Sequence, residues 1–271
     1  MLGSILENVR RTRPLVHCIN NYVTANDCAM IVLACGASPI MADEPEEAEE
    51  ITARCRGLCL NAGTPDARRA ASMLTAGKRA NALGLPVVLD PVGAGASRFR
   101  TELVRTLLGE VRFAVIRGNV SEIRVLAAGT DAAGGVDADA AVTEGNLASL
   151  TAFAMEFACR TGAVAAMTGA IDVVTDGKTA YLVRNGHPEM RYVTGAGCQL
   201  SALTAAFAAA NPERPLEAAA AAVCTMGLAG ELAYRRMKPE DGSASYRNYI
   251  IDAVRNMTPE RLEEGADYEM R

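Results

Sequence analysis

A glycine-rich turn directly before an alanine-rich helix carries the strongest chemical signal in the sequence. Gly195, Ala196, Gly197 and Cys198 stand at the start of a helix expected over residues 198–210. Glycine lets the backbone approach a ligand closely, and the free N–H groups of a first helical turn bind a phosphoryl group. The motif therefore predicts an anion hole, although a glycine-rich turn before a helix is more often an ordinary turn.

Cys198 is the candidate base at this helix start. The positive end of a helix dipole favours a thiolate, and a thiolate can accept the proton of a hydroxyl group. Taken alone, a cysteine at such a position is more often a small buried apolar residue. The residues by themselves leave both interpretations open.

Two carboxylates follow predicted strands, at the place where ligands of open α/β sheets collect. Asp90 ends the apolar run 87–90 and precedes a Pro-Val-Gly-Ala-Gly turn, and Glu122 follows the apolar run 114–117. Both carboxylates can help to place Mg2+ near phosphate groups, directly or through water. Asp90 alone also fits a turn aspartate that stands where its strand ends.

Three polar side chains belong to the same predicted sheet edge. Arg117 can clamp a phosphate group, whereas most arginines near strand ends are solvated. Asn119 lies three residues before Glu122, so both side chains face one side of the next helix start, where Asn119 equally fits an N-cap. Thr168 ends the run 164–168 and either offers its hydroxyl to nucleotide phosphates or only marks a turn.

The N-terminal part of the chain offers groups for a small flat pocket. Asn20 lies in the segment 17–23 and Met41 in the segment 36–42. Compact amide and thioether groups suit such a pocket. A methionine is more often a core residue than a ligand contact, so Met41 carries this prediction only together with the other motifs.

The elements that position these residues alternate between short apolar runs and helix-length segments, which favours a mostly parallel sheet with helices on both faces. Two further strand candidates, 172–175 and 178–183, flank Asp176-Gly177, which fits a two-residue hairpin turn near one sheet edge. The Gly- and Ala-rich segment 129–138 is expected to be a loop. The other expected strands are 58–61, 87–90, 114–117 and 164–168, and the expected helices are 21–35, 46–54, 66–83, 101–108, 144–160, 198–210 and 216–236.

Length and composition favour one cytoplasmic α/β domain over residues 1–271. The chain has 27 basic and 32 acidic residues and only 4% aromatic residues, which gives nucleic-acid binding no support. No apolar run resembles a signal peptide or an uninterrupted membrane span. The eight cysteines include no C-x-x-C pair and the two histidines are not spaced like ligands, so neither disulfides nor zinc are expected.

Six segments, in this order along nearly the whole chain, resemble the hydroxyethylthiazole kinase family of the ribokinase-like superfamily. The resemblance implies a ribokinase-like three-layer α/β/α sandwich with a mostly parallel central sheet and an antiparallel edge hairpin. It also implies a homotrimer with substrate pockets at subunit interfaces. The implied reaction is phosphorylation of the hydroxyl of 4-methyl-5-(2-hydroxyethyl)thiazole by ATP with Mg2+, in thiamine biosynthesis or salvage. The six segments are His17–Val23, Gly36–Ala42, Asp90–Gly95, Gly118–Ile123, Thr168–Gly169 and Thr194–Ala202.

The resemblance further implies roles for individual residues. Most ribokinase-like enzymes carry an aspartate base where this chain, like similar thiazole kinases, carries Cys198. The cysteine is then either a weaker base or a placeholder beside the anion hole of Gly195, Ala196 and Gly197. The other implied roles are thiazole binding for Met41, Gly195 and Asn20, ATP binding for Arg117, Thr168 and Asn119, and Mg2+ binding for Asp90 and Glu122.

Other functions are compatible with the same phosphate-binding loops. A kinase for pyridoxal or a hydroxymethylpyrimidine, or an ATP-dependent hydro-lyase, would share the fold, but Cys198 and the segments around Asn20 and Met41 argue against these. A nucleotide-binding regulator without catalysis is the alternative of a different class. Release of ADP on addition of the thiazole alcohol separates a kinase from such a regulator.

Overall fold

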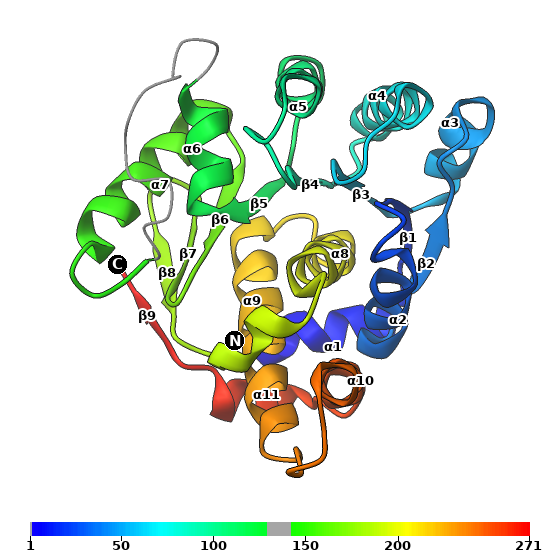
Figure 1. The fold of residues 1–271 in the computed structure, drawn as a ribbon. Helices are drawn as coiled ribbons and strands as arrows, with labels where there is room; N and C mark the ends of the chain where they lie inside the picture. Colours follow the sequence, from blue (N-terminus) through cyan, green and yellow to red (C-terminus); the bar gives the residue numbers. More distant parts are fainter. Residues whose placement is uncertain (1, 129–141) are drawn as a thin grey trace.

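A nine-stranded sheet lies between two layers of helices in the computed structural model, which describes residues 2–128 and 142–271 (Figure 1). The strands pair in the order β2-β1-β3-β4-β5-β6-β7-β8-β9. The loop expected over 129–138 lies outside the described residues. The strands are β1 (Leu15–Ile19), β2 (Ser38–Met41), β3 (Gly57–Asn61), β4 (Val87–Asp90), β5 (Val115–Asn119), β6 (Val164–Thr168), β7 (Asp172–Thr175), β8 (Ala180–Val183) and β9 (Tyr268–Met270).

Strand direction decides where polar side chains gather. Strands β1 to β6 pair in parallel, whereas β7, β8 and β9 pair antiparallel at one end of the sheet. The residues that end β1, β3, β4, β5 and β6 therefore lie along one edge of the sheet, which is called the carboxyl edge below. The mostly parallel sheet with an antiparallel hairpin near one end agrees with the sequence-based prediction.

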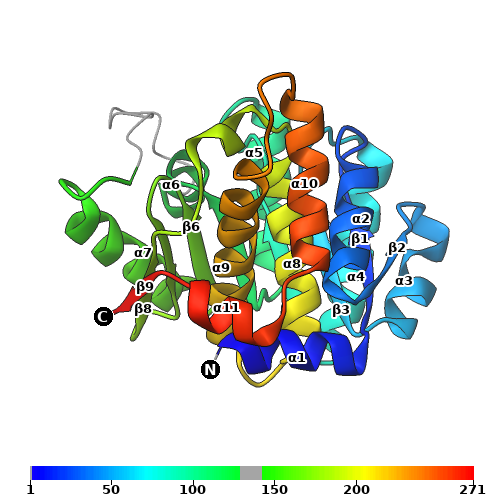
Figure 2. The ribbon, with the colours of Figure 1, turned by 90° about the horizontal axis from the view of Figure 1, so that it is seen from below.

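Helices cover both faces of the sheet. Figure 1 shows one group above the strands and the other below them, and Figure 2 shows the second group in front of the sheet. The first group is α3 (Pro45–Arg54), α4 (Ala67–Ala82), α5 (Arg98–Glu110), α6 (Val120–Ala128) and α7 (Leu147–Thr161). The second is α1 (Leu2–Thr12), α2 (Ala25–Cys35), α8 (Ala196–Ala210), α9 (Pro215–Tyr234), α10 (Ser243–Arg255) and α11 (Pro259–Gly265), with the short 3-10 helix η2 (Pro188–Tyr192) before α8.

The two helical layers explain why the strands read as continuous apolar runs. Every residue of β3, β4 and β8 is buried, because side chains on both faces of these strands pack against helices. Helix α8 is buried on nearly all sides, and its alanines let it approach the sheet closely. The starts of α4 and α5 have local signals, since the side chains of Asp66 and Ser97 accept hydrogen bonds from the backbones of Arg69 and Arg100.

The two-residue turn predicted at Asp176-Gly177 is wrong. Thr175 pairs with Ala180, so four residues, 176–179, connect β7 and β8. The Asp176 carboxylate accepts hydrogen bonds from the backbone N–H groups of the two residues that follow Gly177, and this closes the wider loop. Gly177 has a φ of +90°, which a residue with a side chain rarely adopts.

One described helix, α9, is long and apolar enough to cross a membrane by length and composition alone. In the fold, 78% of its most apolar stretch is buried. Its alanine-rich sequence packs against α8, α10 and the strands β6, β7 and β8. The apolar character of α9 is therefore accounted for by its place in the core.

Candidate active site

A chain of buried hydrogen bonds joins the start of α8 to the carboxyl edge of the sheet. The side-chain nitrogen of Asn21 donates to the Cys198 sulfur at 3.3 Å and to Asn61 Oδ1 at 2.9 Å. The Asn61 side-chain nitrogen donates in turn to Asp90 Oδ2 at 2.9 Å. The backbone N–H of Thr24 donates to Asn21 Oδ1 at 3.1 Å and thereby fixes which end of the amide faces the sulfur. Cys198 and Asp90 are thus connected through two fixed amides.

Arg117 extends this network to the last parallel strand. One guanidinium nitrogen donates to Thr168 Oγ1 at 2.7 Å, and another lies 3.9 Å from Asp90 Oδ1. The guanidinium also passes directly beneath the helix start, because a Cβ atom at Gly197 would lie 2.4 Å from Arg117 Nη1. Glycine at position 197 therefore leaves the space in which this cation approaches the first turn of α8.

The start of α8 offers free amide groups beside that cation. Gly195 is the N-cap with a φ of +81°, and a Cβ atom there would lie 2.2 Å from the Thr24 methyl carbon. The amide of Ala196 donates to Val193 O, whereas those of Gly197 and Cys198 have no hydrogen-bond partner among the described residues. Two N–H groups at the positive end of a helix, next to a guanidinium, form an anion-binding arrangement.

Burial disfavours the ionised form of Asp90, and the nearby Arg117 offsets this effect only in part. Burial raises the pKa of Asp90 to about 6, even though Arg117 acts to lower it, and Glu122 raises it further. Asp90 is fully buried, and its Oδ1 has no hydrogen-bond partner among the described residues. An orphaned carboxylate oxygen of this kind is typical of a group that completes its interactions with a ligand or a cation.

The pKa of the Cys198 thiol is raised, whereas the helix dipole alone predicts a lowered pKa. Burial raises its pKa above the ordinary value, and the nearby Asp90 carboxylate raises it further, whereas hydrogen bonds such as that from Asn21 act in the opposite direction. Desolvation outweighs the helix start because Cys198 is only 7% exposed. Burial at this helix start therefore favours the neutral thiol over the thiolate.

Asn119 and Glu122 cap helix α6 reciprocally. Asn119 Oδ1 accepts from the Glu122 backbone at 2.8 Å, and Glu122 Oε2 accepts from the Asn119 backbone at 2.9 Å. The other oxygen of Glu122 accepts from the backbone N–H of Gly93 at 3.1 Å. The N-cap role left open for Asn119 is thus present in the structure. Glu122 in addition ties the turn after β4 to the start of α6.

Asn20 and Met41 lie at the carboxyl ends of neighbouring strands, on the far side of Asn61 from Arg117. Asn20 follows β1 directly and is buried, and neither polar atom of its side chain has a hydrogen-bond partner among the described residues. Met41 ends β2 at one end of the sheet and is 39% exposed. No hydrogen bond joins either side chain to Cys198 among the residues described.

The sequence motifs assign no site role to two residues of the network, Asn21 and Asn61. Asn21 lies in the segment 17–23, where only Asn20 is a predicted ligand contact, and Asn61 is predicted only as the end of a strand. An asparagine that ends a buried parallel strand, as Asn61 does, is the signal that could have pointed to this edge. His17, in contrast, has a structural role, since its ring bonds to Thr52 Oγ1 and Ala42 O.

Comparison with known proteins decides the family. A sequence model of the hydroxyethylthiazole kinase family matches residues 6–260. The hydroxyethylthiazole kinase of Clostridium acetobutylicum is 56% identical over 271 residues, which cover 99% of either chain. This chain belongs to the hydroxyethylthiazole kinase family.

Solved structures agree with this family assignment. The hydroxyethylthiazole kinase of Pyrococcus horikoshii aligns with a TM-score of 0.89 at 36% identity, over 100% of this chain and 98% of that one. A ribokinase-like superfamily protein of Enterococcus faecalis aligns with a TM-score of 0.61 over 93% and 95% of the two chains, and at 14% identity it shows likeness of fold alone. The fold of this hydroxyethylthiazole kinase family member is therefore the expected ribokinase-like α/β sandwich.

Proposed function

We propose that this chain transfers the γ-phosphoryl group of ATP to the hydroxyl of 4-methyl-5-(2-hydroxyethyl)thiazole, a step that serves thiamine biosynthesis or salvage. The observation that carries the proposal is the convergence of Cys198, Asp90 and Arg117 beside the free amides that begin α8. Family membership supplies the substrate, and the anion-binding geometry suits phosphoryl transfer.

The reaction is an in-line displacement. The substrate oxygen attacks the γ-phosphorus as the bond to the β,γ-bridging oxygen breaks and ADP leaves, and the thiolate form of Cys198 takes the hydroxyl proton. The guanidinium of Arg117 and the amides of Gly197 and Cys198 balance the charge that develops on the transferring group. Asn21 directs the sulfur through its hydrogen bond, which is itself fixed by the backbone of Thr24.

The binding roles that the family resemblance implies are compatible with the burial and contacts of each residue. The Asn20 amide is buried and has no hydrogen-bond partner among the described residues, and it binds the thiazole together with the Gly195 backbone and the exposed thioether of Met41. Arg117 and Thr168, already hydrogen-bonded to one another, contact ATP. Asn119 lies opposite Thr168 in the sheet and contacts the nucleotide there. It also caps helix α6 through its hydrogen bonds with Glu122.

A divalent cation such as Mg2+ fits this donor set only as a partner of phosphate and water. Among the described residues no three His, Cys, Asp or Glu side chains gather as a metal cluster. Glu122 already accepts two backbone hydrogen bonds, whereas Asp90 Oδ1 accepts none within the described part of the chain. Mg2+ commonly binds through one or two carboxylates plus substrate phosphates and water, which matches Asp90 and Glu122. When bound, the cation would neutralise phosphate charge.

The assembly proposed is a cytoplasmic homotrimer of a single kinase domain, residues 1–271, with substrate pockets at the subunit interfaces. Large apolar side chains remain exposed around α2 and the neighbouring strand β2, and they support burial against another copy. They are Tyr22, Val23, Met30 and Met41.

The proposed function is tested by ADP release from purified protein with ATP, Mg2+ and a panel of alcohols. We expect ADP and the thiazole phosphate to form in equal amounts, and turnover to depend on the thiazole alcohol. Faster turnover with pyridoxal or a hydroxymethylpyrimidine would move the assignment to a related kinase. ATP binding without ADP release for any alcohol would instead indicate a regulator.

Replacing Gly195 by alanine is expected to lower kcat/KM about 10-fold to 100-fold, since the new methyl group must displace Thr24 or the helix start and thereby misplace the anion-binding amides. The left-handed backbone at this position adds a stability loss of about 1–2 kcal/mol. Steady-state kinetics and denaturant unfolding measure the two effects separately.

Gly84→Ala provides the matched control for this change. Gly84 has a similar left-handed φ of +68°, but nothing lies within 4 Å of its added Cβ. The control should lose stability by a comparable amount while kcat/KM stays unchanged. Equal kinetic losses in both variants would show that Gly195 acts through stability and not through the helix start.

A further inference from the structure

A cluster of three arginines lies at the edge of the sheet opposite the carboxyl edge, which carries the candidate active site. It lines a cavity of about 620 Å³ bounded by Arg10, Arg13, Ser38, Arg255 and Asn256, at the end of helix α2. Ser38 begins β2 and Arg13 stands two residues before β1, so the cavity opens near the amino ends of these parallel strands. The residues of the proposed kinase reaction stand at the carboxyl edge.

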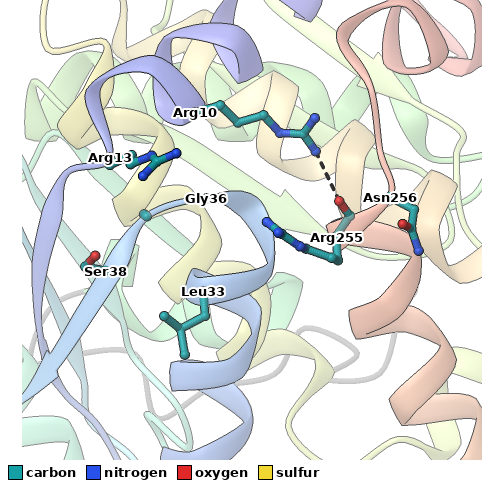
Figure 3. A pocket seen from close by; sticks show the side chains of 8 residues that line it. Arg10, Arg13, Leu33, Gly36, Ser38, Arg255 and Asn256 are labelled. Atoms are coloured by element: carbon teal, nitrogen blue, oxygen red, sulfur yellow. Dashed lines mark hydrogen bonds between the residues drawn. The ribbon is translucent and has the colours of Figure 1, made fainter.

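The three arginines come from separate parts of the chain. Arg10 belongs to the last turn of α1, Arg13 to the connection that leads into β1, and Arg255 to the end of α10. Figure 3 shows their side chains arranged around Gly36, the residue at which α2 ends. No acidic residue lines the cavity among the described residues. The cluster stands out on a chain whose formal net charge is -5.

Arg10 has a structural role, whereas the side chains of Arg13 and Arg255 have none among the described residues. Arg10 donates to the backbone oxygens of Arg255 and Met257, which holds α1 against the end of α10. The side chains of Arg13 and Arg255 make no hydrogen bond or ion pair within the described part of the chain. Two guanidinium groups therefore face the cavity with their donors available.

Arg10 lies close enough to Arg255 for their positive charges to repel each other. Burial lowers the pKa of Arg10, and the nearby Arg255 lowers it further, while Cys35 and the exposed Glu260 act in the opposite direction. Arg13 holds a φ of +45°, in the left-handed region that non-glycine residues rarely adopt. Within the described residues, the lining of the cavity itself holds no carboxylate, so an anion that binds between these like charges interacts favourably with them.

We propose that this cavity binds the diphosphate group of a small molecule. Arg13 and Arg255 supply paired N–H donors, Arg10 adds a third positive charge, and the hydroxyl of Ser38 and the amide of Asn256 can complete the hydrogen bonds. Guanidinium groups match phosphate oxygens in charge and in two-pronged geometry. The cavity volume lies within the range of ordinary small-molecule sites, so a ligand larger than a bare diphosphate also fits.

The test uses inorganic pyrophosphate as the probe, without divalent metal, in calorimetric titrations of the full-length protein. Arg117→Gln is titrated first, because it removes the cation of the candidate active site. Saturable binding should persist in this variant. Adding Arg13→Gln and Arg255→Gln should raise the pyrophosphate Kd by about tenfold or more, because each substitution removes a charged hydrogen bond to the ligand.

A matched variant and a second measurement locate the binding. Arg11→Gln with Arg261→Gln removes two exposed arginines that do not line the cavity, and the pyrophosphate Kd should change less than about threefold. In the wild type, pyrophosphate should protect Arg13 and Arg255 from phenylglyoxal, as read by mass spectrometry. Equal labelling with and without pyrophosphate, or unchanged affinity after both cavity arginines are replaced, would overturn the proposal.

Discussion

Arg117→Gln is expected to lower kcat/KM for the thiazole alcohol by at least about 100-fold, because the variant loses the guanidinium that lies beside the free amides at the start of α8. The guanidinium bonds to Thr168 and lies next to the Asp90 carboxylate and the Gly197 backbone, so no other described side chain can take its place without rearrangement. Steady-state kinetics with ATP and the thiazole alcohol as varied substrates measure the loss.

Two variants separate the chemistry of Arg117 from general charge removal. Arg117→Lys keeps the charge but loses the two-pronged hydrogen bonding, so its activity should lie between those of wild type and Arg117→Gln. Arg214→Gln removes an arginine that pairs with Glu217 at the start of α9, and it should leave kcat/KM unchanged. If folded Arg117→Gln protein kept near wild-type kcat/KM, the proposed charge balance would be wrong.

Cys198→Ala is expected to lower kcat by about 100-fold, the lower end of what a general base contributes. The wild-type kcat should also rise from pH 7 to pH 9. The sign follows from the raised pKa of the thiol, because the thiolate fraction then increases with pH throughout this range. The pH profile of kcat, measured in a buffer of constant ionic strength, tests the base role directly.

Cys198→Asp provides the sharper comparison, because a carboxylate is already ionised at pH 7. The aspartate variant should keep measurable turnover and lose the rise of kcat above pH 7. Cys224→Ala, which removes a buried free thiol of α9 outside the hydrogen-bonded network, should keep the wild-type profile. A folded aspartate variant without turnover, or an alanine variant with the wild-type profile, would mean that Cys198 only fills space beside the anion hole.

The glycine-rich turn at the start of α8 could be predicted from the sequence because its residues are neighbours in the chain. Two glycines, a cysteine and a helix start stand within four residues, and their backbone N–H groups point the same way whatever surrounds them. The strands that carry Asp90 and Thr168 were equally readable, because a strand covered on both faces has to be apolar along its length.

The partners of Cys198 could not be predicted, since they depend on how α8 packs against the sheet. Asn21 and Cys198 are separated by 177 positions, and Asn21 and Asn61 by 40, so no local pattern relates them. The same packing reverses the expected effect of the helix dipole on the thiol pKa, because burial is a property of the whole fold.

The sequence by itself determined the fold class, the order of the main elements and the place of the glycine-rich turn before α8, all of which depend on local periodicity and on residue types next to one another. Only the tertiary structure decided which distant residues contact one another. Arg10 and Arg255 are 245 positions apart and contact each other only because the end of α10 returns to α1. Contacts between distant segments arise from the packing of complete helices and strands, and a linear pattern carries no signal for them.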